Sequence, residues 1–244
     1  MQKYIAVINP RMDQDEIARV ITKDIAGALF SISHQNYPMA AKLMAQVKAL
    51  SKKQNRPISL IQDVSGMTDP LDMEFGLKSG VDWLVVANPE QAKMAKKLNK
   101  NIPIIWKAGK FPKDAGVDSI LHAKLEDPDA EVAGIGHIKH RVSLHVKQKI
   151  LESIKHMAQH TNASAIAVSD LGEAKALSAM RPVQKIILHP KNEFHAHQAS
   201  IYWGVHPIFP QSNLQATLKN RQLVTKGKRF IDATKIKHVT INSV

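Results

Sequence analysis

The sequence predicts an α/β protein made of two consecutive domains. Short apolar runs alternate with amphipathic segments through residues 1–124, the pattern of strands and helices in a parallel sheet or barrel. Residues 125–142 differ in character, since acidic residues are followed by glycines and then by basic residues, which indicates a linker. A second alternation fills residues 143–244. We therefore expect a barrel-like domain over 1–124, a linker over 125–142 and a second α/β domain over 143–244.

The first domain contains apolar runs with the length of buried strands. These runs lie at residues 4–9, 28–33, 57–64, 81–87, 102–107 and 117–123. The amphipathic segments between them predict helices at 13–24, 37–53, 70–79 and 89–98. About six strands fall short of the eight that close a (β/α) barrel. We therefore expect an incomplete barrel, whose open strand edges must be covered by other surfaces.

The second domain begins with a long amphipathic segment, which predicts a helix at 144–160. Further helices are expected at 173–180, 193–202 and 213–221, and strands at 165–168, 185–188, 205–209, 230–233 and 238–241. This order of elements again favours an α/β sheet.

The composition is that of a soluble globular chain, with 44% hydrophobic and 23% charged residues. Cysteine is absent, which excludes disulfides and thiolate metal sites and agrees with a cytoplasmic location. No run approaches the ~20 apolar residues that span a membrane. The first nine residues also lack the features of a signal peptide. We therefore expect no membrane association.

The chain is strongly basic, with a formal net charge of +13 and a pI near 9.8. Such a balance can serve nucleic acids, anionic membranes or phosphorylated ligands. The lysines are spread out, however, and aromatic residues that could stack on bases make up only 5% of the chain. A solvated basic surface is therefore favoured over nucleic-acid binding. Polyanion binding stays as an alternative, and a steep fall of affinity with salt would be its signature.

A stretch near the C-terminus resembles the C-terminal domain of pyruvate kinases. Residues 181–210 are RPVQKIILHPKNEFHAHQASIYWGVHPIFP, where an Arg-Pro pair precedes a strand, a helix ends in Trp-Gly and a proline-containing strand follows. Residues 162–168 (NASAIAV) and 222–230 (QLVTKGKRF) resemble the first strand and a late turn of the same domain. The resemblance implies a pyruvate-kinase C-terminal-type α/β fold. It also implies a homo-oligomer, because relatives associate through this domain.

The N-terminal half is similar to the catalytic barrel of the same family. Residues 31–34 (SISH) resemble its Asn-Phe-Ser-His motif, and residues 58–66 (ISLIQDVSG) resemble its third strand. Residues 68–83 resemble the segment that follows the inserted lid domain, and 102–107 (IPIIWK) the strand that carries the catalytic lysine. The resemblance thus implies a pyruvate-kinase-like barrel without the lid and without the last two barrel strands.

Pyruvate kinases are glycolytic phosphotransferases that move a phosphoryl group between phosphoenolpyruvate and ADP with magnesium and potassium. By resemblance Lys107 matches the catalytic lysine. The metal-binding glutamate two residues later is replaced by Gly109, and the substrate arginine of the second strand by Leu29. Glu126 or Asp127 falls near the second metal carboxylate.

The same resemblance points to a potassium site and a substrate site. Ser33 and Asp63 match potassium ligands, whereas Ser31 replaces an asparagine. Ser33, His34 and Asp63 are the candidate substrate-binding residues. Asp63 and Ser33 are equally compatible with loop or helix-capping roles, and Lys107 with a solvated lysine.

Three functions remain open from the sequence. The leading hypothesis is a pseudoenzyme that has lost the family's catalysis, requires no cofactor and acts by binding or assembly. The second is a residual phosphotransferase that uses phosphoenolpyruvate or a nucleotide, with magnesium and potassium as cofactors. The third is the basic polyanion-binding protein. A small phosphorylated ligand and a second copy of the chain are the expected partners.

Overall fold

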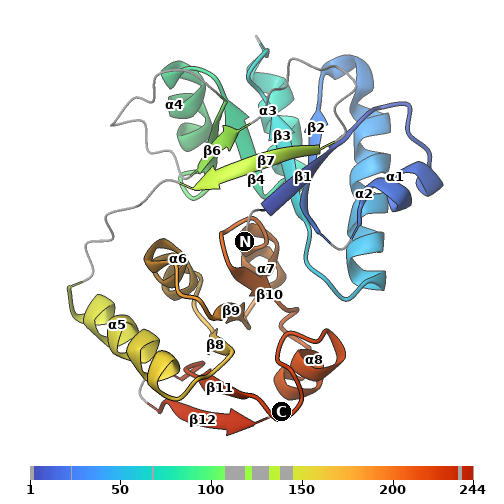
Figure 1. The fold of residues 1–244 in the computed structure, drawn as a ribbon. Helices are drawn as coiled ribbons and strands as arrows, with labels where there is room; N and C mark the ends of the chain where they lie inside the picture. The colour runs from blue at the N-terminus through green and yellow to red at the C-terminus, as the bar shows by residue number, and fades with distance from the viewer. Residues whose placement is uncertain are drawn as a thin grey trace. The chain divides into compact units, whose positions relative to one another are not determined.

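The computed structural model describes residues 3–22, 24–67, 69–107, 119–122, 132–137, 145–235 and 238–243. The chain divides into two compact units (Figure 1). One unit comprises residues 2–54 and 58–138, and the other residues 139–244 with residues 1 and 55–57. Among the described residues, no helix is long and apolar enough to cross a membrane.

The first unit alternates strands and helices as the sequence predicts. Its strands are β1 (Lys3–Ile8), β2 (Ile25–Ser31), β3 (Ser59–Asp63), β4 (Trp83–Val86), β5 (Ile104–Lys107), β6 (Ser119–His122) and β7 (Val132–His137). Its helices are α1 (Gln14–Val20), η1, a 3-10 turn (His34–Asn36), α2 (Tyr37–Lys53), α3 (Pro70–Lys78) and α4 (Pro89–Leu98). Helix α1 ends earlier than expected, because the backbone leaves the helical conformation at Ile21.

Strand β7 corrects two expectations. Residues 132–137 lie in the segment assigned to a linker, yet they pair antiparallel with both β1 and β6. Strands β1 to β6 are parallel, and β7 closes them into a barrel. Strands β1 and β6 therefore do not have the unpaired edges that an incomplete barrel would leave. Gly134 and Gly136 hide the strand pattern in the sequence, because glycine is a weak strand former that nevertheless suits tight barrel corners.

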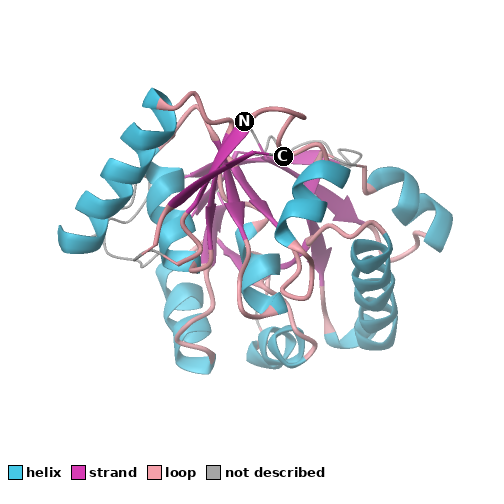
Figure 2. Cartoon of the chain, turned by 90° about the horizontal axis from the view of Figure 1, so that it is seen from below, coloured by secondary structure: helices cyan, strands magenta, loops and turns pink. Residues whose placement is uncertain are grey.

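Strands β2 to β5 of the barrel are buried on both faces. Figure 2 shows the strands on the inside, with helices outside them. Outward-facing side chains pack with the helices in one apolar cluster that includes Phe30, Leu60, Leu84, Trp106, Leu43 and Ala95. The alternate positions are also buried, and they include Leu29, Ile61, Trp83 and Ile105. Because side chains alternate along a strand, this second set fills the barrel interior.

Helix α3 packs closely on β3 at Gly76. Gln62 is fully buried, and its Nε2 donates a 2.8 Å hydrogen bond to the carbonyl oxygen of Asp72 in α3. A Cβ atom at Gly76 would clash with the Gln62 amide. Glycine at this helical position therefore serves the close approach of helix and strand.

The substitution Gly76→Ala is expected to lower the free energy of unfolding by about 1–2 kcal/mol, although alanine is the better helix former. The reason is that the Gln62 amide must move and lose its bond to α3. Urea unfolding measures the effect. Gly66→Ala is the control, since a Cβ there meets nothing within 4 Å. Equal stabilities of the two variants would contradict the prediction.

The second unit is a five-stranded α/β sheet. Its elements are α5 (His145–His160), β8 (Ala165–Val168), α6 (Leu171–Met180), β9 (Lys185–Leu188), α7 (Glu193–Ala199), β10 (Val205–Pro207), α8 (Leu214–Asn220), β11 (Arg229–Asp232) and β12 (Thr240–Ser243). The strand order is β10-β9-β8-β11-β12. The first four strands are parallel, and β12 joins antiparallel to β11 at an edge.

Candidate functional site

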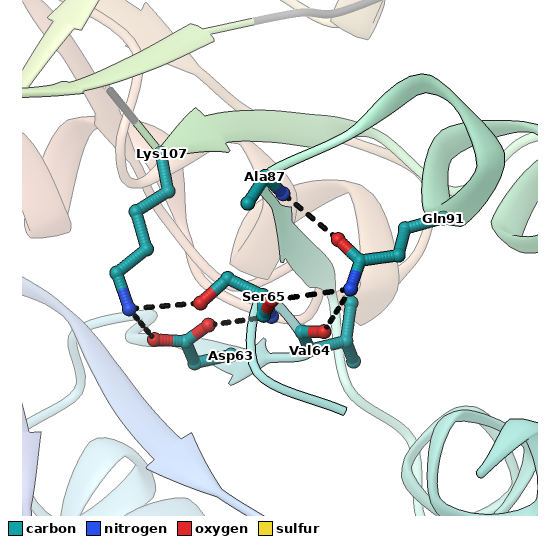
Figure 3. A network of polar contacts seen from close by, with 6 residues as sticks. All are labelled: Asp63, Val64, Ser65, Ala87, Gln91 and Lys107. Carbon is teal, nitrogen blue, oxygen red and sulfur yellow. Dashed lines mark hydrogen bonds and ion pairs between the residues drawn. The ribbon is translucent and has the colours of Figure 1, made fainter. Parts of the chain in front are cut away.

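The side chains of Lys107 and Asp63 meet in the first unit (Figure 3). Lys107 Nζ lies 2.8 Å from Asp63 Oδ2 and also donates to Ser65 Oγ at 2.8 Å. Lys107 is the last residue of β5, Asp63 is the last residue of β3, and Ser65 follows two residues later. Two residues that the sequence singles out separately thus form one cluster.

The barrel places this cluster at its carboxyl-terminal mouth, the end at which (β/α) barrels carry their active sites. Gln62 points outward to α3, so the adjacent Asp63 points inward. Likewise Trp106 belongs to the cluster packed against the helices, so Lys107 points inward. The alternation of side chains along β3 and β5 therefore brings the carboxylate of Asp63 and the ammonium group of Lys107 together inside the barrel mouth.

The loop after β3 holds Asp63 in place. The backbone N–H of Ser65 donates to Asp63 Oδ1 at 2.9 Å. Since Lys107 occupies Oδ2, both oxygens of the carboxylate have a partner. Ser65 therefore contacts both charged groups, one through its backbone and the other through its hydroxyl.

Gln91 braces this loop from α4 (Figure 3). Its Nε2 donates to the carbonyl oxygens of Val64 at 2.8 Å and Ser65 at 3.2 Å, while its Oε1 accepts from the N–H of Ala87 at 2.9 Å. The end of β4 and the loop after β3 are thereby tied together. Gln91 does not stand out in the sequence as a site residue. The Asn88-x-x-Gln91 spacing is that of a helix cap, and Asn88 Oδ1 accepts from the N–H of Gln91, but that spacing does not reveal the bonds to the other loop.

The positive charge of Lys107 is balanced within the cluster, so Lys107 differs from a lysine that is free to bind an anion. The side chain of Lys107 is 32% exposed and that of Asp63 is 17% exposed. The two formal charges cancel at a distance of 2.8 Å. An anionic ligand that approaches Lys107 therefore meets a carboxylate that is already hydrogen-bonded to the same ammonium group.

The other candidate residues are placed as follows. Ser31 ends β2 and is the register partner of Asp63, with an exposed side chain. The backbone N–H of Ser33 donates to Asn36 Oδ1 at 2.9 Å, which is a helix-capping contact. His34 is exposed at the start of η1. These residues surround the same end of β2 without a hydrogen bond to Lys107.

The remaining metal candidates, Glu126 and Asp127, lie outside the described residues, as does Gly109. Within the part of the chain that is described, no group of three or more histidine, aspartate or glutamate side chains could hold a metal ion.

Comparison with known families concerns the second unit. Residues 148–241 match the family model described as pyruvate kinase, alpha/beta domain. Over these residues the chain is similar to the pyruvate kinase α/β domain. The resemblance seen in residues 181–210 is thereby confirmed, and the chain is a barrel-like α/β domain followed by a pyruvate kinase α/β domain. No curated protein matches the chain.

Two acidic residues lie at the amino-terminal end of α6, Asp170 as its N-cap and Glu173 in its first turn. Asp170 Oδ1 accepts from the N–H of Glu173 at 3.1 Å and so caps the helix. Ser169 Oγ donates to the carbonyl oxygen of Thr234 at 2.7 Å. The amino-terminal end of α6 therefore already carries negative charge from the protein itself, where a free helix end would attract an anion.

Proposed function

We propose that this pyruvate-kinase-related protein binds a small phosphorylated or carboxylated ligand at the barrel mouth and does not carry out the phosphoryl transfer of its family. The observation that carries the proposal is the contact of Lys107 with Asp63 and Ser65. The cluster keeps a cation available to an anionic ligand but balances it with a carboxylate. Such a site is suited to weak, reversible binding.

Phosphoryl transfer demands more positive charge than this cluster offers. The reaction is stabilised by cationic side chains and by divalent ions that bridge the phosphate. Leu29 occupies the position that resembles the family's substrate arginine, and its side chain is buried within the barrel. Gly109 stands at the position of a metal carboxylate, and glycine offers no side-chain oxygen for magnesium. Both replacements support binding over turnover.

The proposal predicts opposite effects of two substitutions on phosphoenolpyruvate binding. Asp63→Asn removes the competing charge and is expected to tighten binding about tenfold, corresponding to ~1.4 kcal/mol. Lys107→Gln removes the cation and is expected to abolish measurable binding. Isothermal titration calorimetry with phosphoenolpyruvate, and separately with inorganic phosphate, measures both.

Lys78→Gln is the matched control for these variants. Lys78 also forms an ion pair, with Glu74 at 2.7 Å, but on the exposed surface of α3. Its replacement should leave the affinity unchanged. Binding that is insensitive to Lys107→Gln would refute the assignment of the ligand to this site.

The residual phosphotransferase remains the second candidate, because Lys107 ends a strand at the barrel mouth as the catalytic lysine of the family does. In that case magnesium and potassium would be its cofactors. Pyruvate formation that depends on Lys107 would favour this candidate over the first.

We also propose that the chain forms a homo-oligomer through its second unit. The barrel is closed, so assembly no longer follows from open strand edges there. In the second unit, however, β12 is an edge strand, and the side chain of Ile241 in it is 46% exposed. Exposed edge strands are commonly covered by a partner. Light scattering at micromolar concentration is expected to give a multiple of 27.1 kDa. Ile241→Lys should shift the mass toward the monomer. A wild-type monomer at all concentrations would contradict the proposal.

A further inference from the structure

A groove on the outside of the barrel lies between α1 and α2, which run beside each other in Figure 1. Its volume is about 540 Å³, within the range of small-molecule pockets. It is separate from the Lys107 cluster, because its lining comes from these two helices alone. We infer that this groove is a binding site for an amphipathic monocarboxylate that carries a hydroxyl group close to its carboxylate.

The apolar part of such a ligand would lie against small and aliphatic side chains. Ile17 and Ala18 line the groove from α1, while Ala45, Ala49 and Leu50 line it from α2. Ile17 is 1% exposed, so the floor is closed. Alanines at 45 and 49 leave room above the helix surface, and an aliphatic chain placed there would bury apolar area on both sides at about 25 cal/mol per Å².

The charges of the lining favour an anion. The charged residues of the lining are Lys42 and Lys53 on α2 and Asp15 on α1, which makes two ammonium groups and one carboxylate. Neither lysine forms an ion pair with any residue that the structure describes. A carboxylate in the groove can therefore pair with an ammonium group without displacing a partner from it.

Gln46 identifies which lysine holds the carboxylate. It lies one helical turn from Lys42 and two turns from Lys53, about 6 and 10.5 Å along the helix axis. Its Oε1 is buried and has no hydrogen-bond partner among the described residues. Rotation of the terminal amide, a soft torsion, exchanges Oε1 with Nε2. A hydroxyl near the carboxylate could then donate to Gln46 while the carboxylate pairs with Lys42.

The test uses 3-hydroxydecanoate as the probe and decanoate as its matched analogue without the hydroxyl. Calorimetry or a ligand-observed NMR titration on the full chain is expected to show saturable binding of both. We expect 3-hydroxydecanoate to bind at least threefold tighter, since one net hydrogen bond contributes about 0.5–1.5 kcal/mol. Inorganic phosphate should not compete, because it has no apolar part.

Three substitutions locate the ligand. Lys42→Gln is expected to weaken 3-hydroxydecanoate binding at least tenfold, whereas Lys53→Gln, the control lysine in the same groove, changes it less than threefold. Ala49→Phe fills the groove at an exposed helical position and is expected to abolish binding while α2 stays folded. Gln46→Leu should make the two fatty acids bind equally.

The inference is overturned by the absence of saturable binding, by binding that survives Ala49→Phe, or by equal effects of the two lysine substitutions. Equal affinity of the two fatty acids for the wild-type chain would overturn the role of Gln46. Circular dichroism of each variant checks that the fold is retained, so that a loss of binding is not a loss of structure.

Discussion

Purified protein is expected to form pyruvate from phosphoenolpyruvate and ADP no faster than the background reaction, even with magnesium and potassium present. Loss of one electrostatic contact to the transition state commonly costs about 10²–10³ in rate. By the resemblance of the barrel to the catalytic domain of pyruvate kinases, Leu29 and Gly109 would stand where two such contacts are made, and Lys107 is partly neutralised by Asp63. Allowing for non-additivity, we expect a deficit of at least about 10⁴ relative to an active family member.

A coupled assay of pyruvate release measures this expectation, with Lys107→Ala run beside the wild type. Equal background rates in both agree with a site that only binds. Robust turnover that disappears in Lys107→Ala would reverse the conclusion, since it would show that the lysine still supports a transferring phosphoryl group. In that event, dependence of the rate on magnesium and potassium would identify the residual phosphotransferase.

The second large effect is expected at Asp82, which lies just before β4, at the opposite end of the strand from the cluster of Lys107 and Asp63. The residue is 4% exposed, and burial raises the pKa of its carboxyl from 3.8 to about 7. The N–H of Leu60, which donates to Asp82 Oδ2 at 2.8 Å, and the charge of Lys48 lower the pKa but do not offset the burial. Neutral Asp82 is therefore the form that the fold favours.

The sign of the pH effect follows from proton binding. Between pH 4 and 7 the folded chain keeps the Asp82 proton that the unfolded chain releases, so the free energy of unfolding falls as pH rises. Each pH unit in that interval removes about 1.4 kcal/mol, or about 4 kcal/mol in total. The contribution of Asp82 is therefore fully present below pH 4 and is lost by about pH 7.

Asp82→Asn is expected to remove this slope, because the amide oxygen can still accept from Leu60 and carries no charge. Urea unfolding of wild type and variant at several pH values between 4 and 7.5 gives the difference directly. Asp24→Asn, at an exposed carboxylate, is the control for other titrating groups. Parallel pH curves for wild type and Asp82→Asn would contradict the prediction.

Much of the fold follows from local sequence pattern. Buried runs such as those of β8 and β9, and helices that begin with a cap and a proline, such as α4, are local features, so their positions are predicted within a few residues. The resemblance of residues 181–210 to the C-terminal domain of pyruvate kinases is also a property of the sequence, and the family match over 148–241 agrees with it. Lys107 and Asp63 can each be identified from the sequence as a candidate site residue, but the sequence does not show that they contact each other.

The tertiary structure alone decided what these elements do together. Closure of the barrel depends on pairing between β7 and β1, more than a hundred residues apart, and two glycines conceal β7 from local analysis. The bond between Lys107 and Asp63 requires two strands with inward-facing ends at the same height. Gln91 and the groove beside α2 likewise depend on neighbours that are distant in sequence. Sequence pattern reports which face of an element is apolar, whereas the partner that meets that face is set by non-local packing.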